Sequence, residues 1–315
     1  MPTPANKAKM SPLEIPIPVP LPTPLRIRQR KEIDDLDSAF GNMMIDDSNR
    51  NVHFGDKDNY FLHTPYNQEI IKNLQAEEMK YVLSPSFMSA RGEVNPYWRI
   101  CLIDFLIKIR ERLDLDYSTL HLSVKLINRF VALQPIALSK FQLLGLTCLF
   151  IAAKIEEMYP PSIAQLIILA YHKFSESDFL GMEVIVLNEL KFKIHMPTPM
   201  DFLDPFLFCI PDSELLNKEG KNVKTMCLFL LDKSLVDIQC VQWSASTITA
   251  AAIIVVVDFI GDFHTKGKTK NDKVNIRKDF TISDELLQHY TNHTKDHLMP
   301  CVKHLTKLVY NGNRR

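Results

Sequence analysis

Two segments of this chain are apolar on nearly every face of a helix. They are LLGLTCLFIAAK at 143–154 and SASTITAAAIIVVV at 244–257. Both mix small residues, such as Gly145 and Ala252, with large apolar ones, so neighbouring helices can approach closely. A helix without a polar face must lie at the centre of a bundle. We therefore expect two helical domains, each built around one buried helix.

The composition excludes several other classes of protein. Only 9 of 315 residues are glycine, which argues against a turn-dense β fold and against glycine-rich phosphate loops. The apolar run 248–260 is too short to span a bilayer. The scattered cysteines form no CxxC pair, and lysine plus arginine balance aspartate plus glutamate at 37 each. We expect a soluble, intracellular protein with reduced thiols, and neither nucleic acid nor a membrane as its main partner.

The first 62 residues are predicted to be a disordered, proline-rich regulatory tail. Eight of the first 24 residues are proline, a pattern that favours extended polyproline II. A basic cluster at 26–31 is either a nuclear import signal or part of a solvated tail, and we expect the protein in nucleus and cytoplasm. Thr23, in the segment TPLR, is a candidate site for proline-directed phosphorylation.

From Tyr66 onward, apolar residues recur with the 3.6-residue period of a helix. Asn95-Pro96 is a helix start, and residues 139–142, SKFQ, have the form of a capping box. The prediction is an all-α chain with two tandem five-helix folds, preceded by an N-terminal helix and the tail. The first fold with its helix takes 63–197 and the second takes 198–315. Apart from the helices near 96–156, the predicted helices span 66–82, 162–172, 176–191, 200–208, 221–236, 245–260, 283–290 and 295–309.

No catalytic constellation is present. The chain has no Walker loop, no GxGxxG after a strand, no GxSxG and no HExxH. On one helix His297, Cys301 and His304 have a spacing that suits zinc, whereas Asn292 indicates a helix break that turns His289 and His293 elsewhere. Cys301 also falls on an apolar helix face, so we expect solvated histidines and a buried thiol. No metal and no cofactor are expected.

Several segments resemble the cyclin box. They are WRICLIDFL at 98–106 (family pattern MRxxLxDWL), LHLS at 120–123, INRF at 127–130, AAKIEEMYPP at 152–161 and LKFKI with PT at 190–198. The likeness covers about 66–310 and is weaker in the second half. It fits the A/B group of mitotic and S-phase cyclins. MExxVL at 182–187 favours A-type, while EEMYPP reads equally like B-type.

This resemblance implies a regulatory subunit, without enzyme activity, that binds and allosterically activates a cyclin-dependent Ser/Thr kinase in cell-cycle control. Lys154 and Glu183 match the family's pair that holds the kinase's regulatory helix. The implied apolar contacts are Ile155, Leu187, Phe192, Ile194, Tyr66 and Ile70. From the residues alone, Lys154 and Glu183 would read as an internal ion pair. Two alternatives stay open, a cyclin-fold scaffold or transcription-factor-like module that activates no kinase, and a helical enzyme with an unrecognised site.

Two positions depart from the family pattern. The resemblance gives structural roles to Arg99, Leu143 and position 128, where an aspartate that pairs with the arginine is replaced by Asn128. We expect Arg99 to keep a hydrogen bond and to lose its counter-charge. The resemblance also implies a patch for RxL-type substrates or inhibitors, formed by Trp98, Cys101, Leu102, Phe105 and Gln142. The four apolar residues read equally as core, and Gln142 is equally explained by the capping box. Lys108 stands where an acidic residue would meet the peptide's arginine, so docking should be weaker.

The signals for timed destruction are missing from the first 62 residues. They contain neither RxxL nor KEN, and RxxL occurs only inside the first-fold helix region, from 99 to 115. Cell-cycle-timed destruction is therefore not expected from this segment.

Overall fold

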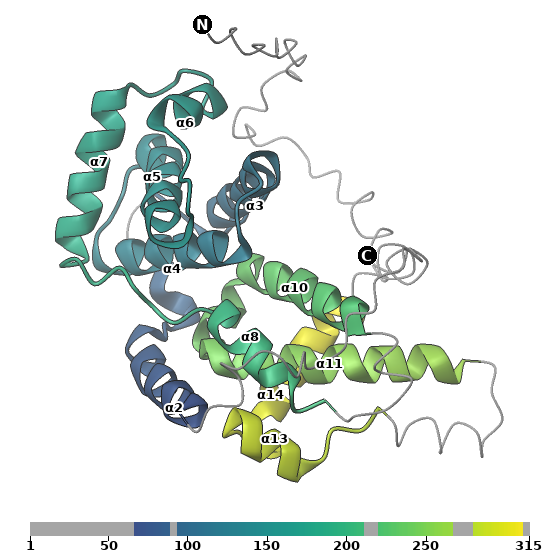
Figure 1. Cartoon of the computed structure of the whole chain (residues 1–315). Helices are drawn as coiled ribbons and strands as arrows, with labels where there is room; N and C mark the ends of the chain where they lie inside the picture. Colours follow the sequence, from purple (N-terminus) through teal and green to yellow (C-terminus); the bar gives the residue numbers. More distant parts are fainter. Residues whose placement is uncertain (1–65, 89–92, 211–219, 267–279, 311–315) are drawn as a thin grey trace, which may run out of the picture.

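The computed structural model describes residues 66–88, 93–210, 220–266 and 280–310 (Figure 1). Within these ranges the protein contains eleven α-helices, short 3-10 turns and no strand. The predicted all-α class with two tandem helical folds is confirmed. The tail at 1–62 and its candidate phosphosite Thr23 lie outside the described residues.

The first fold is built around one buried helix, as expected. Its central helix α5 (Leu138–Glu156) is contacted by three of its neighbours. Residues 141–149 of α5 are all buried. The neighbours are α3 (Pro96–Leu113), α4 (Tyr117–Leu133) and α7 (Glu176–Glu189), with the short α6 (Ile163–Leu169) packed on α7.

The second fold repeats this plan around α11 (Ala245–Thr265). Helices α5 and α11 are long and apolar enough to cross a membrane by length and composition. However, 67% of the most apolar stretch of α5 and 78% of that of α11 are buried inside the protein, which is typical of core helices. The helices α8 (Pro199–Leu207), α10 (Gly220–Val236) and α14 (Lys295–Tyr310) contact α11, and the short α13 (Asp284–Thr291) packs on α8.

The predicted helix starts are confirmed at one site and wrong at another. Asn95 accepts a hydrogen bond from the Trp98 backbone N–H at 3.2 Å and caps α3. The predicted capping box at 139–142 does not form, because α5 already begins at Leu138. A carboxylate from the preceding segment lies at this helix start, where Glu93 Oε2 accepts from the Leu138 N–H at 3.1 Å. This contact supplies the acceptor that a capping residue would otherwise provide.

The N-terminal helix α2 (Asn67–Glu78) packs on the second fold, although it precedes the first in sequence. Ile71 is buried in the second core, while Ile70 stays exposed. The predicted helix 66–82 is shorter in the structure, and the 3-10 turn η1 (Met79–Tyr81) follows it. In the other direction, Val236 of α10 packs against the first core. The two folds therefore share side chains across their boundary.

Two helical glycines provide a matched test of this packing. A Cβ atom at Gly145 would lie 2.6 Å from Leu102 Cδ1, and Leu102 is fully buried. A Cβ atom at Gly181 meets nothing within 4 Å. We expect Gly145→Ala to lower the free energy of unfolding by about 1–2 kcal/mol, because overpacking outweighs the gain in helix propensity. Gly181→Ala should raise it by up to about 1 kcal/mol.

Urea denaturation of the two variants measures both effects. Equal unfolding midpoints would mean that α3 and α5 do not approach as closely at Gly145 as the structure shows.

Candidate functional site

Lys154 and Glu183 form an ion pair that joins α5 to α7. Lys154 lies in the last turn of α5, where a cation complements the helix dipole. Its Nζ also lies 4.3 Å from the centre of the Phe150 ring, a cation–π contact. The Lys154 side chain is still 40% exposed, whereas that of Glu183 is 13% exposed. Glu183 therefore orients a lysine that a partner can reach.

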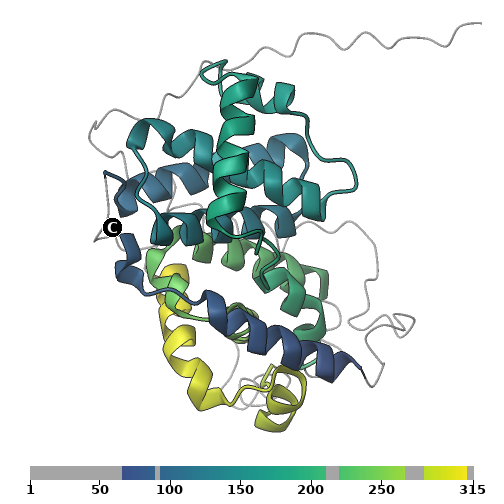
Figure 2. The ribbon, with the colours of Figure 1, turned by 90° about the vertical axis from the view of Figure 1, so that its left-hand side faces the viewer.

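Exposed apolar side chains occur on the same two elements and on α2. Ile155 follows Lys154, and Phe192 lies just beyond the end of α7 with 66% of its surface exposed. Tyr66 and Ile70, also exposed, lie at the start of α2. Figure 2 shows α2 and α7 on the same face of the molecule. The other two predicted contacts, Leu187 and Ile194, are partly buried against the first core.

The turn after α7 holds Phe192 outward. Lys191 and Phe192 have φ angles of 52° and 56°, a left-handed conformation that costs non-glycine residues about 1–2 kcal/mol each. The Phe192 N–H donates to the Leu187 carbonyl at 2.9 Å, which closes the helix. The same turn recurs after α6 at Tyr171 and His172, so it is a general helix end in this fold. At Phe192 it leaves a large aromatic ring in solvent.

Sequence reasoning missed several exposed apolar residues near this surface. Met158 and Tyr159 are 85% and 86% exposed and follow α5 directly. On α7, Leu180, Val184 and Ile185 are exposed, while Phe179, Met182 and Val186 are buried. The signal in the sequence was a helix with apolar residues on more than one face, which is unusual for a helix at the edge of a bundle.

The predicted substrate-docking patch on α3 is only partly accessible. Trp98, Cys101 and Phe105 are half-buried, whereas Leu102 is fully buried below Gly145. Leu102 is therefore a core residue.

Two neighbours of the patch have their own contacts and exposure. Gln142 is buried, and its Oε1 accepts from Lys173 Nζ at 3.2 Å. Lys108 is exposed on α3. Peptide docking at the patch stays a prediction.

Arg99 connects the two folds. It is 2% exposed, its Nε donates to Asn128 Oδ1 at 2.9 Å, and its Nη1 donates to the Val236 carbonyl at 3.1 Å. Burial lowers the pKa of Arg99 to about 10, partly offset by Cys240 and the carboxylate of Asp237. The predicted hydrogen bond to Asn128 is present. The last carbonyl of α10 and the nearby Asp237 replace part of the missing counter-charge.

His297, Cys301 and His304, whose spacing on one helix suits zinc, do not come together in the structure, and Cys301 is the buried thiol that was expected. Asn292 ends α13 with a φ angle of 56°, which confirms the predicted helix break. His297 is exposed and stacks on His293, and Cys301 is buried in the second core. His304 turns away from both towards Asp237.

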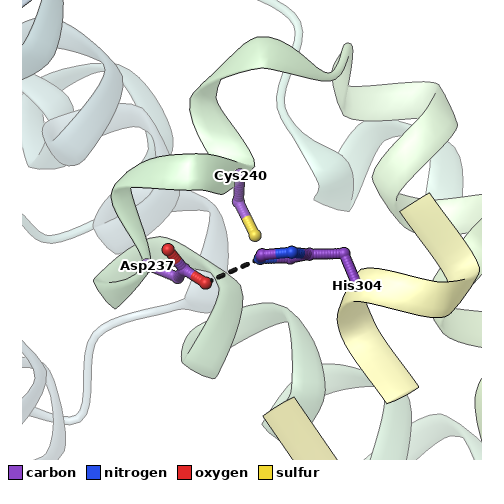
Figure 3. A group of neighbouring side chains, drawn as sticks. All are labelled: Asp237, Cys240 and His304. Carbon is purple, nitrogen blue, oxygen red and sulfur yellow. Dashed lines mark hydrogen bonds and ion pairs between the residues drawn. The ribbon is translucent and has the colours of Figure 1, made fainter. Parts of the chain in front are cut away.

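A different group of metal-ligand types forms where η3 (Ile238–Gln242) meets α14. Ligand atoms of Asp237, Cys240 and His304 lie within 4.8 Å of one another (Figure 3). The chemistry of these donors suits a metal ion. Each of them already has a role, because Asp237 Oδ1 accepts from the Gln239 N–H and Oδ2 from His304 Nε2 at 2.7 Å. Burial raises the pKa of the Cys240 thiol, which keeps it protonated.

Comparison with known proteins gives a consistent result over most of the chain. Two family models match: cyclin, N-terminal domain at residues 69–195, and cyclin, C-terminal domain at 197–315. G2/mitotic-specific cyclin-B1 of Oryzias latipes is 28% identical over 89% of this chain and 63% of its own length. G2/mitotic-specific cyclin-B2 of Rana japonica is 29% identical over 90% of this chain and 65% of its own length.

These relatives also bear on the A-type or B-type assignment and on how much of a relative's length this chain covers. Both are B-type, so the predicted closeness to A-type is not confirmed. The chain spans less than two thirds of the length of either relative. Among solved structures, a viral cyclin from herpesvirus saimiri aligns with a TM-score of 0.62 at 18% identity, over 77% of this chain and 97% of that one. This alignment shows the fold.

Proposed function

Because the chain belongs to the cyclin family, we propose that it binds a cyclin-dependent Ser/Thr protein kinase and activates it allosterically in cell-cycle control. The observation that carries this proposal is the exposed face of α5, α7 and α2, where Lys154 stands among unpartnered apolar side chains. Large exposed apolar side chains that gather on one face favour a protein partner. The proposed complex acts in nucleus and cytoplasm.

The chemistry of this face suits a partner helix. Apolar side chains of the partner would cover Phe192, Ile155 and Ile70, which removes their surface from water. Lys154, held in place by Glu183, can donate to carbonyls at the exposed end of that helix. The chain supplies no catalytic group in this mechanism. It shifts the kinase towards the state in which its own lysine–glutamate pair and activation loop are aligned.

Kinase activation by the purified full chain tests the proposal. The chain is mixed with each of several cyclin-dependent kinases, and histone phosphorylation is measured. We expect at least a tenfold increase with one kinase or more, and a loss of at least tenfold with Lys154→Ala or Glu183→Ala. Lys303→Ala, an exposed lysine on α14 in the second fold, is the matched control and should keep full activity.

The outcomes separate the proposal from its rivals. Full activity of both alanine variants would exclude the Lys154 interface. If no kinase binds the folded chain at all, the scaffold function replaces kinase activation.

A further inference from the structure

Three side chains of metal-ligand type converge in the second fold, and none of them belongs to the proposed kinase-binding face. The ligand atoms of Asp237, Cys240 and His304 all lie within 4.8 Å of one another. Figure 3 shows the Cys240 sulfur and the Asp237 carboxylate directed at the same end of the His304 ring. In the part of the chain that the structure describes, no other group of three such side chains comes together.

The local structure of η3 places Asp237 and Cys240 side by side. Asp237 caps this 3-10 turn, and its carbonyl accepts from the Cys240 N–H at 3.1 Å. Because a 3-10 turn has three residues per turn, side chains three positions apart lie above one another. The backbone N–H of Gln239 donates to Asp237 Oδ1 at 2.8 Å, which leaves Oδ2 directed at His304. Metal-binding carboxylates are typically held by such a hydrogen bond to their other oxygen.

The third donor comes from α14, and its spacing from the others suits a small ion. The Trp243 ring packs against His304, with the ring centres 5.1 Å apart, and fixes the imidazole. Around tetrahedral zinc, with bonds of about 2.0–2.3 Å, the ligand atoms are roughly 3.2–3.6 Å apart. His304 Nε2 lies 2.7 Å from Asp237 Oδ2. Opening this contact by roughly 0.5 Å makes room for the ion.

Solvent reaches the group from one side. The side chains of His304 and Asp237 are 25% and 20% exposed, whereas Cys240 is 3% exposed. An ion can therefore enter past the imidazole and the carboxylate, and the sulfur lies at the closed end. A water molecule on the open side can complete four ligands, as in zinc sites with three protein donors.

The donors favour zinc over the common hard cations. Thiolate and imidazole suit Zn²⁺, whereas Mg²⁺ and Ca²⁺ prefer oxygen ligands. Binding releases the thiol proton of Cys240 to solvent and moves the Nε2 proton of a neutral His304 to Nδ1. The thiolate and the carboxylate together cancel the charge of the ion, so the filled site presents no net charge to the nearby Arg99.

The place of the sulfur is the observation that points to a metal ion. A hydrogen bond between histidine and aspartate needs no thiol beside it, and a buried thiol ordinarily packs as a small apolar side chain. We propose that Asp237, Cys240 and His304 bind one Zn²⁺ ion, which ties η3 to α14 within the second fold. This site is independent of kinase binding.

Metal titration of the purified full chain tests the site. Zn²⁺ is titrated in competition with a chromophoric chelator, and Co²⁺ is used as a spectroscopic probe. We expect one Zn²⁺ per chain and a melting temperature at least about 3 °C higher in saturating Zn²⁺ than in Mg²⁺ at the same concentration. Bound Co²⁺ should show a thiolate charge-transfer band. Cys240→Ser should abolish this band, and Cys240→Ser and His304→Gln should each weaken zinc binding at least tenfold.

Cys101→Ser on α3 and His297→Gln on α14 are the matched controls, because both residues lie outside the group. Both variants should keep the wild-type zinc affinity and the cobalt band. His304→Gln changes a partly exposed residue, so it keeps the test decisive if Cys240→Ser fails to fold. Equal stabilisation by Zn²⁺ and Mg²⁺ would overturn the proposal. Unchanged zinc affinity of His304→Gln, or a cobalt spectrum without the thiolate band, would place the ion elsewhere and overturn it as well.

Discussion

Glu78→Ala is expected to lower the free energy of unfolding by about 3 kcal/mol and to release α2 from the second fold. Glu78 is 2% exposed, and its carboxylate accepts from both the backbone N–H and the hydroxyl of Ser246. Ser246 lies in the first turn of α11, where a negative charge also complements the helix dipole. Alanine would leave that buried N–H without an acceptor.

Urea denaturation and hydrogen exchange measure the two parts of this prediction. The unfolding midpoint should fall, and the amides of α2 should exchange faster than in the wild type. Glu77→Ala is the matched control, because Glu77 is the preceding residue and its carboxylate accepts from Lys80 and Tyr81 of the adjoining turn η1. Equal midpoints for the two variants would contradict the proposed role of Glu78.

Acidification is expected to destabilise the same junction through His293. Burial lowers the pKa of His293 to about 4, with a further contribution from His297. Its Nε2 lies 2.9 Å from the Ser246 hydroxyl and 3.4 Å from Gln75 Nε2, and its ring stacks on that of His297. Since the single Ser246 hydroxyl proton goes to Glu78, His293 donates to the hydroxyl oxygen.

The direction of this pH effect on stability follows from the number of protons bound by the folded and the unfolded chain. Below about pH 6.5 the unfolded chain binds a proton at His293, while the folded chain binds one only near pH 4. The unfolded state therefore holds more protons in this window, and stability falls as the pH falls through it, by at most about 3 kcal/mol.

Unfolding midpoints measured from pH 7 to pH 4 test this prediction. His293→Gln should flatten the acid slope, whereas His289→Gln, at an exposed position on α13, should keep it. If the His293→Gln slope equals that of the wild type, another group causes the acid sensitivity.

The two helical bundles were predictable from local sequence, because the apolar composition of each central helix already shows that it must be buried. The small and large apolar residues of 143–153 and 244–257 leave no polar face, and these parts of α5 and α11 are almost wholly buried, as expected. Asn95 with Pro96 fixes the start of α3 in the same local way. Contacts between distant segments were not predictable. The Glu93 carboxylate accepts from the first N–H of α5, and Ile71 packs α2 against the second core.

At the candidate site, too, some features were predictable from the sequence and others depend on contacts between distant segments. The resemblance to the family pointed to Lys154 and Glu183, and the structure pairs them. It also pointed to Leu102, which the approach of Gly145 buries completely. The group formed by Asp237, Cys240 and His304 joins residues 67 positions apart, and no spacing rule within one helix could reveal it.

The most direct test of the central claim is kinase activation by a charge-swapped chain. Lys154→Glu and Glu183→Lys are made singly and together, and histone phosphorylation is measured with the kinase that the wild type activates. The double variant restores the ion pair between α5 and α7, so its unfolding midpoint should match the wild type. If Lys154 contacts the kinase, the double variant stays at least tenfold less active than the wild type. Recovery of full activation in the double variant would show that the pair is only an internal ion pair, and would contradict the account.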